Sequence, residues 1–378
     1  MTIRHTLNSL KPHKGARRCL KLAFSALRVL PLGTGLVAAT PASAQAGQGM
    51  GRLPRVLVLA TGGTIAGKAD PRSAIGYDAG STTGQQLVAA VPGVDRLAQL
   101  QVEQIANIPS QDMNHKVWFR LMERINQAFA RHEADAVVIT HGTDTMEETA
   151  FFLDTVLHHD QPVVMTGAMR PGSAISADGP ANIYEAVKVA AHPQAKGRGV
   201  LVVLNDTIHA AHWVSKADST VLQTFVSRQT GPVGIVDPAA VRFYGPPRPR
   251  LFLSLPDGAT LPAVDVVYAH ADMDGRQIDD AIRAGVKGIV IAGMGDGNVS
   301  AQAMQALDRA VRAGIVVVRS SRVGDGFVNR DVEVDDEAHH FVASYDLNPQ
   351  KARLLLQLLL AGGVQDVQAV QRAFAFGY

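Results

Sequence analysis

The feature of this chain that most limits its fold is a series of short, unbroken apolar segments that alternate with helical patterns. Strands without polar alternation are buried on both faces, which is typical of a parallel sheet covered by helices. The sequence therefore predicts an α/β protein. The segments rich in β-branched residues are Arg55 to Ala60, Ala136 to Thr140, Pro162 to Thr166, Val200 to Leu204, Val264 to Tyr268, Gly288 to Ala292 and Ile315 to Arg319.

A change of composition divides the chain, which at 378 residues is long enough for two domains. Between residues 244 and 262 the sequence turns to Pro-Pro and Pro-Arg pairs and a Pro-Asp-Gly turn, which is typical of a linker. We predict a larger N-terminal domain over residues 53–243, with a mainly parallel sheet flanked by helices. A smaller C-terminal α/β domain is predicted over residues 263–378.

Residues 1–44 have the composition of an export signal. They contain seven basic residues and no acidic ones, and an apolar run from Val29 to Ala39 precedes small residues at 42–44 that a signal peptidase accepts. The run is too short to span a bilayer, so a cleaved signal peptide is favoured over a membrane anchor. A periplasmic location is predicted, with the Arg17-Arg18 pair leaving the export route, general secretory or twin-arginine, open.

Removing this leader reverses the net charge of the chain. Taking its seven basic residues from the 36 in the whole sequence leaves 29 against 34 acidic ones, a net charge of −5. The remainder has no Lys/Arg stripe with interleaved aromatics, so a nucleic-acid surface is not expected. The single cysteine, Cys19, lies in the leader, which excludes disulfides, cysteine nucleophiles and cysteine metal ligands from the mature protein.

Informative residues follow several strands directly, at the edge where open α/β sheets collect ligands. The apolar run that begins at Arg55 leads into T-G-G-T-I-A-G over residues 61–67, a glycine turn that presents the hydroxyl of Thr64. Glycines let a substrate approach the backbone closely, so Thr64 is a candidate nucleophile for a bound carbonyl. A turn whose threonine only caps backbone groups is an equal alternative.

Two segments have part of the spacing of nucleotide-binding loops. Gly62, Gly67 and Lys68 fit G-x-x-x-x-G-K, but Ala69 stands where a hydroxyl ligand of Mg²⁺ is required. Residues 293–298 follow a strand as G-M-G-D-G-N, and asparagine stands where a dinucleotide fingerprint has its third glycine. Nucleotide binding is therefore not predicted at either segment.

A second glycine turn, H-G-T-D-T-M-E-E at residues 141–148, leads from a strand into a helix. A threonine or aspartate followed about three residues later by glutamate predicts an N-terminal capping box. The same turn also suits substrate binding, because Asp144 can meet an ammonium group and the Thr143 hydroxyl a carbonyl. A threonine nucleophile needs a base, and Lys216 is a candidate only where its surroundings keep it partly neutral; a single lysine is more often solvated surface.

Six motifs together resemble the bacterial type II L-asparaginase family, including its glutaminase-asparaginase members. The likeness runs in order from about residue 54 to the end of the chain. It implies hydrolysis of L-asparagine to L-aspartate and ammonia through a threonine acyl-enzyme, with some activity on L-glutamine and without a metal or organic cofactor. The motifs are T-G-G-T-I-A-G (61–67), S-Q-D-M (110–113), T-H-G-T-D-T-M-E-E-T-A (140–150), G-A-M-R-P (167–171), S-A-D-G-P (176–180) and L-N-P-Q-K-A-R (347–353).

The resemblance also implies a role for each matched residue. The nucleophile is Thr64, over which a mobile loop closes, and the implied catalytic group is Thr64, Tyr77, Thr143, Asp144 and Lys216. The substrate-binding positions are Gly63, Ser110, Gln111, Asp144, Asp272 and Glu333. The last two are implied to come from a neighbouring subunit, which requires a homo-oligomer, a tetramer built of intimate dimers. Asp272 in place of asparagine indicates some tolerance of L-glutamine.

One tract departs from the family pattern. Residues 208–213 carry His212 where the family often has arginine, and the tract leads directly to Lys216. Two other function classes are alternatives. A periplasmic solute-binding protein would also be exported, two-domained and able to grip an amino acid, but it would need no activated hydroxyl and usually works as a monomer. A nucleotide-dependent enzyme would bind ATP or NAD.

Overall fold

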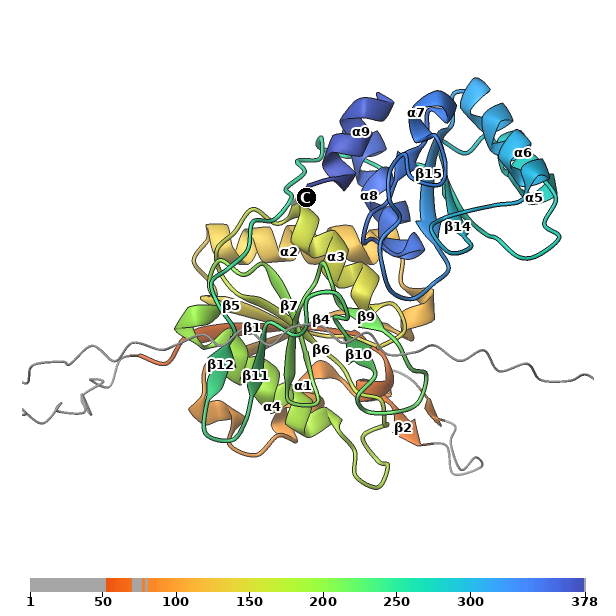
Figure 1. Ribbon diagram of the computed structural model, residues 1–378. Coiled ribbons are helices and arrows are strands. Elements are labelled where there is room, and N and C mark those ends of the chain that lie inside the picture. Colours follow the sequence, from red (N-terminus) through yellow and green to blue (C-terminus); the bar gives the residue numbers. More distant parts are fainter. Residues whose placement is uncertain (1–51, 70–76, 79–80, 377–378) are drawn as a thin grey trace, which may run out of the picture. The chain divides into compact units, whose positions relative to one another are not determined.

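The computed structural model describes residues 52–69, 77–78 and 81–376 of the chain. The predicted signal peptide lies outside the described residues. The larger sheet has eight strands in the order β12-β11-β8-β7-β6-β5-β1-β4 (Figure 1). Their bounds are Arg55–Gly62 (β1), Gln99–Ile108 (β4), Ala136–Thr140 (β5), Val163–Thr166 (β6), Val200–Leu204 (β7), Thr207–Ala210 (β8), Gly234–Val236 (β11) and Val241–Phe243 (β12).

Parallel pairing joins the strands from β7 to β4, and β8, β11 and β12 continue the sheet antiparallel at one edge. Helices cover both faces, because successive side chains of a strand point to opposite sides. In β1, Leu57 and Leu59 pack with α2 and α3, whereas Val56 and Val58 pack with α1 and α4. These helices span Gly84–Ala89 (α1), His115–Ala130 (α2), Met146–Val156 (α3) and Gly179–Ala190 (α4).

The smaller sheet has four parallel strands in the order β13-β14-β15-β16. One of its faces packs with α5 and α6, and the other shares a hydrophobic cluster with α8, α9 and α3. The core of the smaller sheet is therefore continuous with that of the larger one. The bounds are Val264–Tyr268 (β13), Gly288–Gly293 (β14), Val316–Ser321 (β15), Val342–Ala343 (β16), Arg276–Ala284 (α5), Ala301–Arg312 (α6), Asp336–His339 (α7), Pro349–Ala361 (α8) and Val367–Phe374 (α9).

The predicted fold class is confirmed, and the seven apolar runs form β1, β5, β6, β7, β13, β14 and β15. Four strands of the larger sheet were missed. β4 is an edge strand whose glutamines and glutamate leave it partly exposed, so it contains no unbroken apolar run. β8, β11 and β12 have at most four residues each, too few for a periodic pattern.

The segment predicted to be a linker forms neither helix nor strand between residues 244 and 263, yet it is tied to the core. Leu251, Leu253 and Leu255 pack against the cluster that includes α3. Arg250 donates to Asp154 of α3 at 2.9 Å, and the N–H of Leu253 donates to the carbonyl of Thr155. The segment is therefore held along α3 rather than extended into solvent.

Candidate active site

Two strand-end turns meet backbone to backbone at the carboxyl edge of the larger sheet. The neighbouring strands β1 and β5 lead into glycine turns at Gly63 and Gly142. Gly63 has a φ of 82°, and a Cβ built on it would lie 2.3 Å from Cα of Gly142. Only glycine allows this approach. The residues that follow the two glycines, Thr64 and Thr143, therefore lie on adjoining turns.

Thr64 opens a single 3₁₀ turn, η1 (Thr64–Ala66), immediately after β1. The residue is 8% exposed, and Ile65 and Ala66 behind it are buried. Its carbonyl accepts the N–H of Gly67 at 2.8 Å, which closes the turn. The sequence places a threonine at a strand end, and the packing of the turn fixes the backbone that carries it.

Ser110, which follows β4, contacts the turn at Gly142. A Cβ built on Gly142 would lie 2.7 Å from Ser110 Oγ, so these two turns are also in contact. The N–H of Asp144 donates to Ser110 Oγ at 3.2 Å, and Thr145 Oγ1 donates to the Ser110 carbonyl at 2.8 Å. Ser110 is buried, whereas Gln111 beside it is exposed. The turns after β1, β4 and β5 thus form one cluster.

Lys216 joins this cluster from β9 (Ser215–Lys216), a short strand paired with β10 (Phe225–Val226). Its ammonium donates to Thr143 Oγ1 at 2.9 Å and to Asp144 Oδ1 at 2.6 Å. The Lys216 side chain is 15% exposed and that of Asp144 is 59% exposed. The structure thus brings together hydroxyl, carboxylate and ammonium groups that are 72 or 73 residues apart in the chain.

His141 holds the turn that carries Thr143. It is completely buried, and burial lowers the pKa of its imidazole to about 4 against the opposing effect of the Gly142 carbonyl. The neutral ring then donates from Nδ1 to the Gly142 carbonyl at 2.7 Å, because a carbonyl can only accept. Nε2 accepts from Thr149 Oγ1 at 2.9 Å, and that hydroxyl accepts from Trp118 Nε1 at 2.8 Å.

The capping box predicted at this turn is wrong. The N-cap of α3 is Thr145, and its side chain makes no capping hydrogen bond. Its hydroxyl is engaged by Ser110, and the Thr143 hydroxyl by Lys216. Of the two glutamates that could have completed the box, Glu147 and Glu148, Glu147 instead accepts the backbone N–H of Lys216 at 2.9 Å. Hydrogen bonds to residues distant in the chain therefore take the place of the predicted capping bonds.

The chain matches two family models, the N-terminal domain of asparaginase over residues 55–249 and the glutaminase/asparaginase C-terminal domain over residues 263–374. It is 44% identical over 326 residues to the probable periplasmic L-asparaginase of Haemophilus influenzae, an alignment that covers 85% of this chain and 93% of that protein.

The chain belongs to the asparaginase family.

Two further relatives extend the comparison. L-asparaginase 2 of Escherichia coli is 44% identical over 326 residues, covering 85% of this chain and 93% of that protein. Glutaminase-asparaginase of Pseudomonas fluorescens is 37% identical over 329 residues, covering 85% and 90%. The chain is therefore an asparaginase-type enzyme that acts on a small molecule, and the alternative of a solute-binding protein is set aside.

The family resemblance implies three further site residues, Tyr77, Asp272 and Glu333. The backbone of Tyr77 pairs with Ala69 in the ladder of β2 (Lys68–Ala69) and β3 (Tyr77–Asp78), and its side chain lies outside the described part. Asp272 and Glu333 are exposed in the smaller domain of this asparaginase. Among the described residues, no hydrogen bond joins either carboxylate to Thr143, Asp144 or Lys216.

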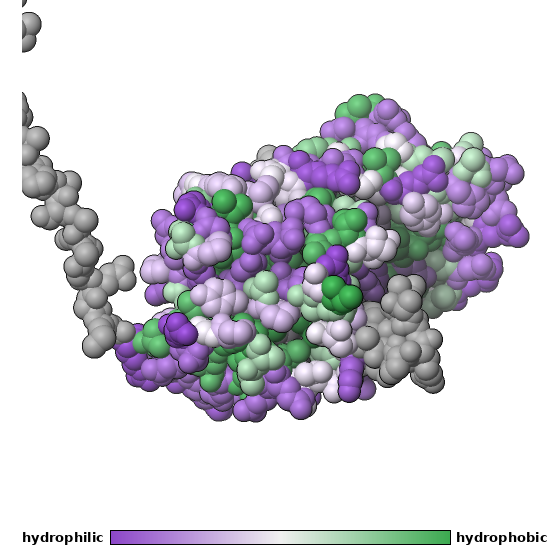
Figure 2. Space-filling model, turned by 90° about the horizontal axis from the view of Figure 1, so that it is seen from below, coloured by the Kyte–Doolittle hydropathy of each residue, from purple (hydrophilic) through white to green (hydrophobic). Residues whose placement is uncertain are grey.

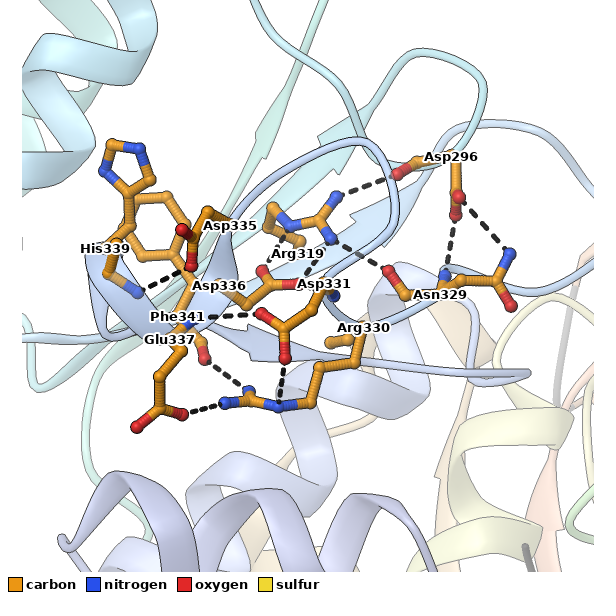
Figure 3. Close-up of polar contacts among 12 residues, drawn as sticks. Asp296, Arg319, Asn329, Arg330, Asp331, Asp335, Asp336, Glu337, His339 and Phe341 are labelled. Atoms are coloured by element: carbon orange, nitrogen blue, oxygen red, sulfur yellow. Dashed lines mark hydrogen bonds and ion pairs between the residues drawn. The ribbon is translucent and has the colours of Figure 1, made fainter.

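The segment that carries Glu333 rests on a buried ion pair (Figure 3). Arg319 donates to both carboxylate oxygens of Asp336 at 2.6 and 2.7 Å, and the two side chains are 1% and 0% exposed. Glu333 itself accepts from Asn298 Nδ2. The ion pair thus anchors the segment from its buried side, and Arg319 also donates to the carbonyls of Asp296 and Asn329.

Sequence reasoning missed the residues that hold Lys216 in this asparaginase. Glu147 Oε1 accepts from Asn348 Nδ2 at 3.3 Å and from Gln350 Nε2. Asn348 Nδ2 also donates to Ser215 Oγ at 3.0 Å. Both amides belong to the L-N-P-Q-K-A-R motif, which supported the family resemblance but received no role. Its polar residues at a helix start were the only indication available.

Within residues 52–69, 77–78 and 81–376, no group of three or more His, Cys, Asp and Glu side chains could hold a metal ion. In the same ranges no helix has both the length and the apolar composition needed to cross a membrane. The face drawn in Figure 2 mixes hydrophilic and hydrophobic residues.

Proposed function

We propose that this enzyme hydrolyses L-asparagine to L-aspartate and ammonia through an acyl-enzyme on Thr64, with some activity on L-glutamine. The observation that carries the proposal is the pair of hydrogen bonds from Lys216 to Thr143 and Asp144, on the turn in contact with the one that leads to Thr64. The names of the relatives, L-asparaginase and glutaminase-asparaginase, support the substrate. No cofactor is invoked.

The proposed reaction has two steps. Thr64 Oγ bonds to the side-chain amide carbon while its proton passes to a neighbouring group, and the C–N bond breaks as the nitrogen takes up a proton and leaves as ammonia. Water then attacks the ester, which releases aspartate and returns the proton to Thr64. Thr143, with Lys216 Nζ 2.9 Å from its oxygen, is the proposed relay, together with Tyr77.

The substrate is a zwitterion, so the site needs groups of both signs. Asp144, whose side chain is 59% exposed, is proposed to meet the α-ammonium group. Ser110, Gln111 and the backbone at Gly63 are proposed to meet the α-carboxylate. One methylene separates the two amides, and a hydrophobic pocket discriminates such a difference by about 1–3 kcal/mol, so activity on both is expected.

Asp272 and Glu333 are proposed to complete the site from a neighbouring subunit in a tetramer built of intimate dimers. Their exposure in the smaller domain supports this arrangement. The domain limits proposed are 53–243 and 263–378 with a linker at 244–262, close to the matched family ranges. We also propose a periplasmic location after removal of residues 1–44, supported by the relative from Haemophilus influenzae, which is a probable periplasmic L-asparaginase.

The proposal is tested by Thr64→Ala, measured side by side on L-asparagine and L-glutamine. We expect kcat on both amides to fall by at least about 10³-fold, while substrate binding persists. Thr61→Val is the matched control, because Thr61 lies in the same segment and is 1% exposed, and its hydroxyl donates to the Thr140 carbonyl. Normal turnover by a folded Thr64→Ala enzyme would refute the nucleophile.

A further inference from the structure

Lys351 is a buried cation outside the cluster described above. It lies in the first turn of α8 and is 2% exposed. A buried lysine is rare unless its charge is compensated, and a positive charge in the first turn of a helix also opposes the helix dipole. Burial lowers the pKa of its ammonium to about 8. A lysine in such an unfavourable place needs specific partners.

Those partners are three carbonyl oxygens of one turn. Lys351 Nζ donates to the carbonyls of Ala211, His212 and Val214 at 3.0, 2.9 and 2.5 Å. An ammonium group has three donors, and each meets one acceptor. A buried carbonyl without a hydrogen-bond partner is destabilising, and this turn is not part of a strand ladder that could pair these carbonyls. The side chain of Lys351 therefore satisfies all three.

The clamped turn leads straight to Lys216. It connects β8 to β9, and Val214 is two residues before Lys216. The His212 side chain is held by the same part of the chain, because its Nε2 lies 3.0 Å from Asp346 Oδ2. The tract that departs from the family pattern is thus fixed at its backbone by Lys351 and at its side chain by Asp346.

We propose that Lys351 is a positioning residue that acts through Lys216, holding the turn before β9 so that the Lys216 ammonium lies between Thr143 and Asp144. This inference rests on the proposed function of Lys216. It gives a role to the L-N-P-Q-K-A-R motif: Lys351 holds the turn before β9 through three backbone carbonyls, and Asn348 and Gln350 hold β9 through Glu147.

The test is a double-substitution cycle with Lys351→Met and Lys216→Met. Methionine preserves most of the length of the lysine side chain but none of its donors. We expect Lys351→Met to lower kcat on L-asparagine by about tenfold or more while KM changes by less than about threefold. On the Lys216→Met background the same substitution should change the residual kcat by less than about twofold, because its route of action is gone.

Gln357→Met is the matched structural control. Gln357 lies on the same helix, is 1% exposed, and donates to the carbonyl of Pro262, away from Lys216. It should lower the melting temperature while kcat stays within about twofold. An equal loss of kcat in Gln357→Met at the same loss of melting temperature would reduce the Lys351 effect to general stability and overturn the proposal.

Lys351→Arg keeps the test decisive if the methionine variant does not fold. It retains the charge with a planar donor group of different shape, so we expect a smaller loss of kcat that again disappears on the Lys216→Met background. If the effect of Lys351→Met or Lys351→Arg on kcat is fully additive with that of Lys216→Met, the positioning role is overturned. If Lys216→Met alone retains normal kcat, the proposed function of Lys216 fails instead, which is a distinct result.

Discussion

The carboxylate of Glu147 accepts the backbone N–H of Lys216 at 2.9 Å, so a helix of the larger domain directly holds the strand that carries the proposed catalytic lysine. Its other oxygen accepts side-chain amides from Asn348 and Gln350. A carboxylate accepts at both oxygens, and all these partners are donors. A carboxylate at position 147 can therefore accept all three of these hydrogen bonds.

Glu147→Gln should disrupt this arrangement, because an amide offers one acceptor and one donor to partners that all donate. We expect a loss of about 1–3 kcal/mol in the free energy of unfolding and a fall of about tenfold in kcat. Urea unfolding and steady-state kinetics measure the two effects. Glu148→Gln is the control: burial raises the pKa of Glu148, so a neutral amide should be tolerated there with kcat nearly unchanged.

Gly63→Ala should abolish most activity, because the new methyl group would lie 2.3 Å from Cα of Gly142 and separate the two turns. We expect kcat to fall by at least about 100-fold. Gly285→Ala is the control, since Gly285 also has a positive φ, 74°, but open space around its Cβ. It should cost about 1 kcal/mol of stability without affecting kcat. Equal kinetics for the two variants would contradict the contact argument.

His141 should make the protein less stable in mild acid. Its pKa is lowered from 6.5 to about 4 by burial, so between these pH values the unfolded chain binds more protons than the folded protein. The free energy of unfolding that the neutral His141 contributes is fully present above pH 6.5 and is lost as the pH falls towards 4. His141→Gln should reduce the slope of unfolding free energy against pH by up to about 1.4 kcal/mol per unit, measured by urea titrations. An unchanged slope contradicts the buried neutral imidazole.

Glu185 predicts the opposite dependence on pH. Burial, followed by the effect of Asp206, raises the pKa of its carboxyl to about 8, so the folded protein holds a proton that the unfolded chain releases. Stability is lost as pH rises from about 4.5 to 8. Glu185→Gln should therefore raise the melting temperature more at pH 8 than at pH 5. A uniform shift at both pH values argues against a protonated Glu185.

The buried pair of Arg319 and Asp336 (Figure 3) should be sensitive to the loss of one partner. Arg319→Met leaves the carboxylate without its cation, and a loss of about 3–5 kcal/mol in the free energy of unfolding is expected. Adding Asp336→Leu should recover part of this loss, because no charge is then left buried. The exposed pair of Arg309 and Asp279 is the control, where Arg309→Met should cost less than about 1 kcal/mol.

The sequence predicted the strands buried on both faces, because an unbroken apolar run is a local property. It did not predict β4, whose polar residues lie at an exposed sheet edge, or the short antiparallel strands β8, β11 and β12. The candidate site residues that the sequence indicated also depend on local patterns. Thr64, Thr143 and Asp144 lie in contiguous motifs, whereas the hydrogen bond between Glu147 and Lys216 joins residues 69 apart in the chain, so the sequence offered Glu147 and Glu148 only a local capping role.

The sequence by itself determined the α/β class, the family and the strand-end turns that carry the hydroxyl and carboxylate groups, since each depends on neighbours along the chain. Only the tertiary structure decided that the start of α8, with Lys351 and the N-cap residue Asn348, contacts the segment that leads to Lys216. These contacts cross more than 130 residues, and a buried lysine or amide takes whichever acceptors the packed fold places around it.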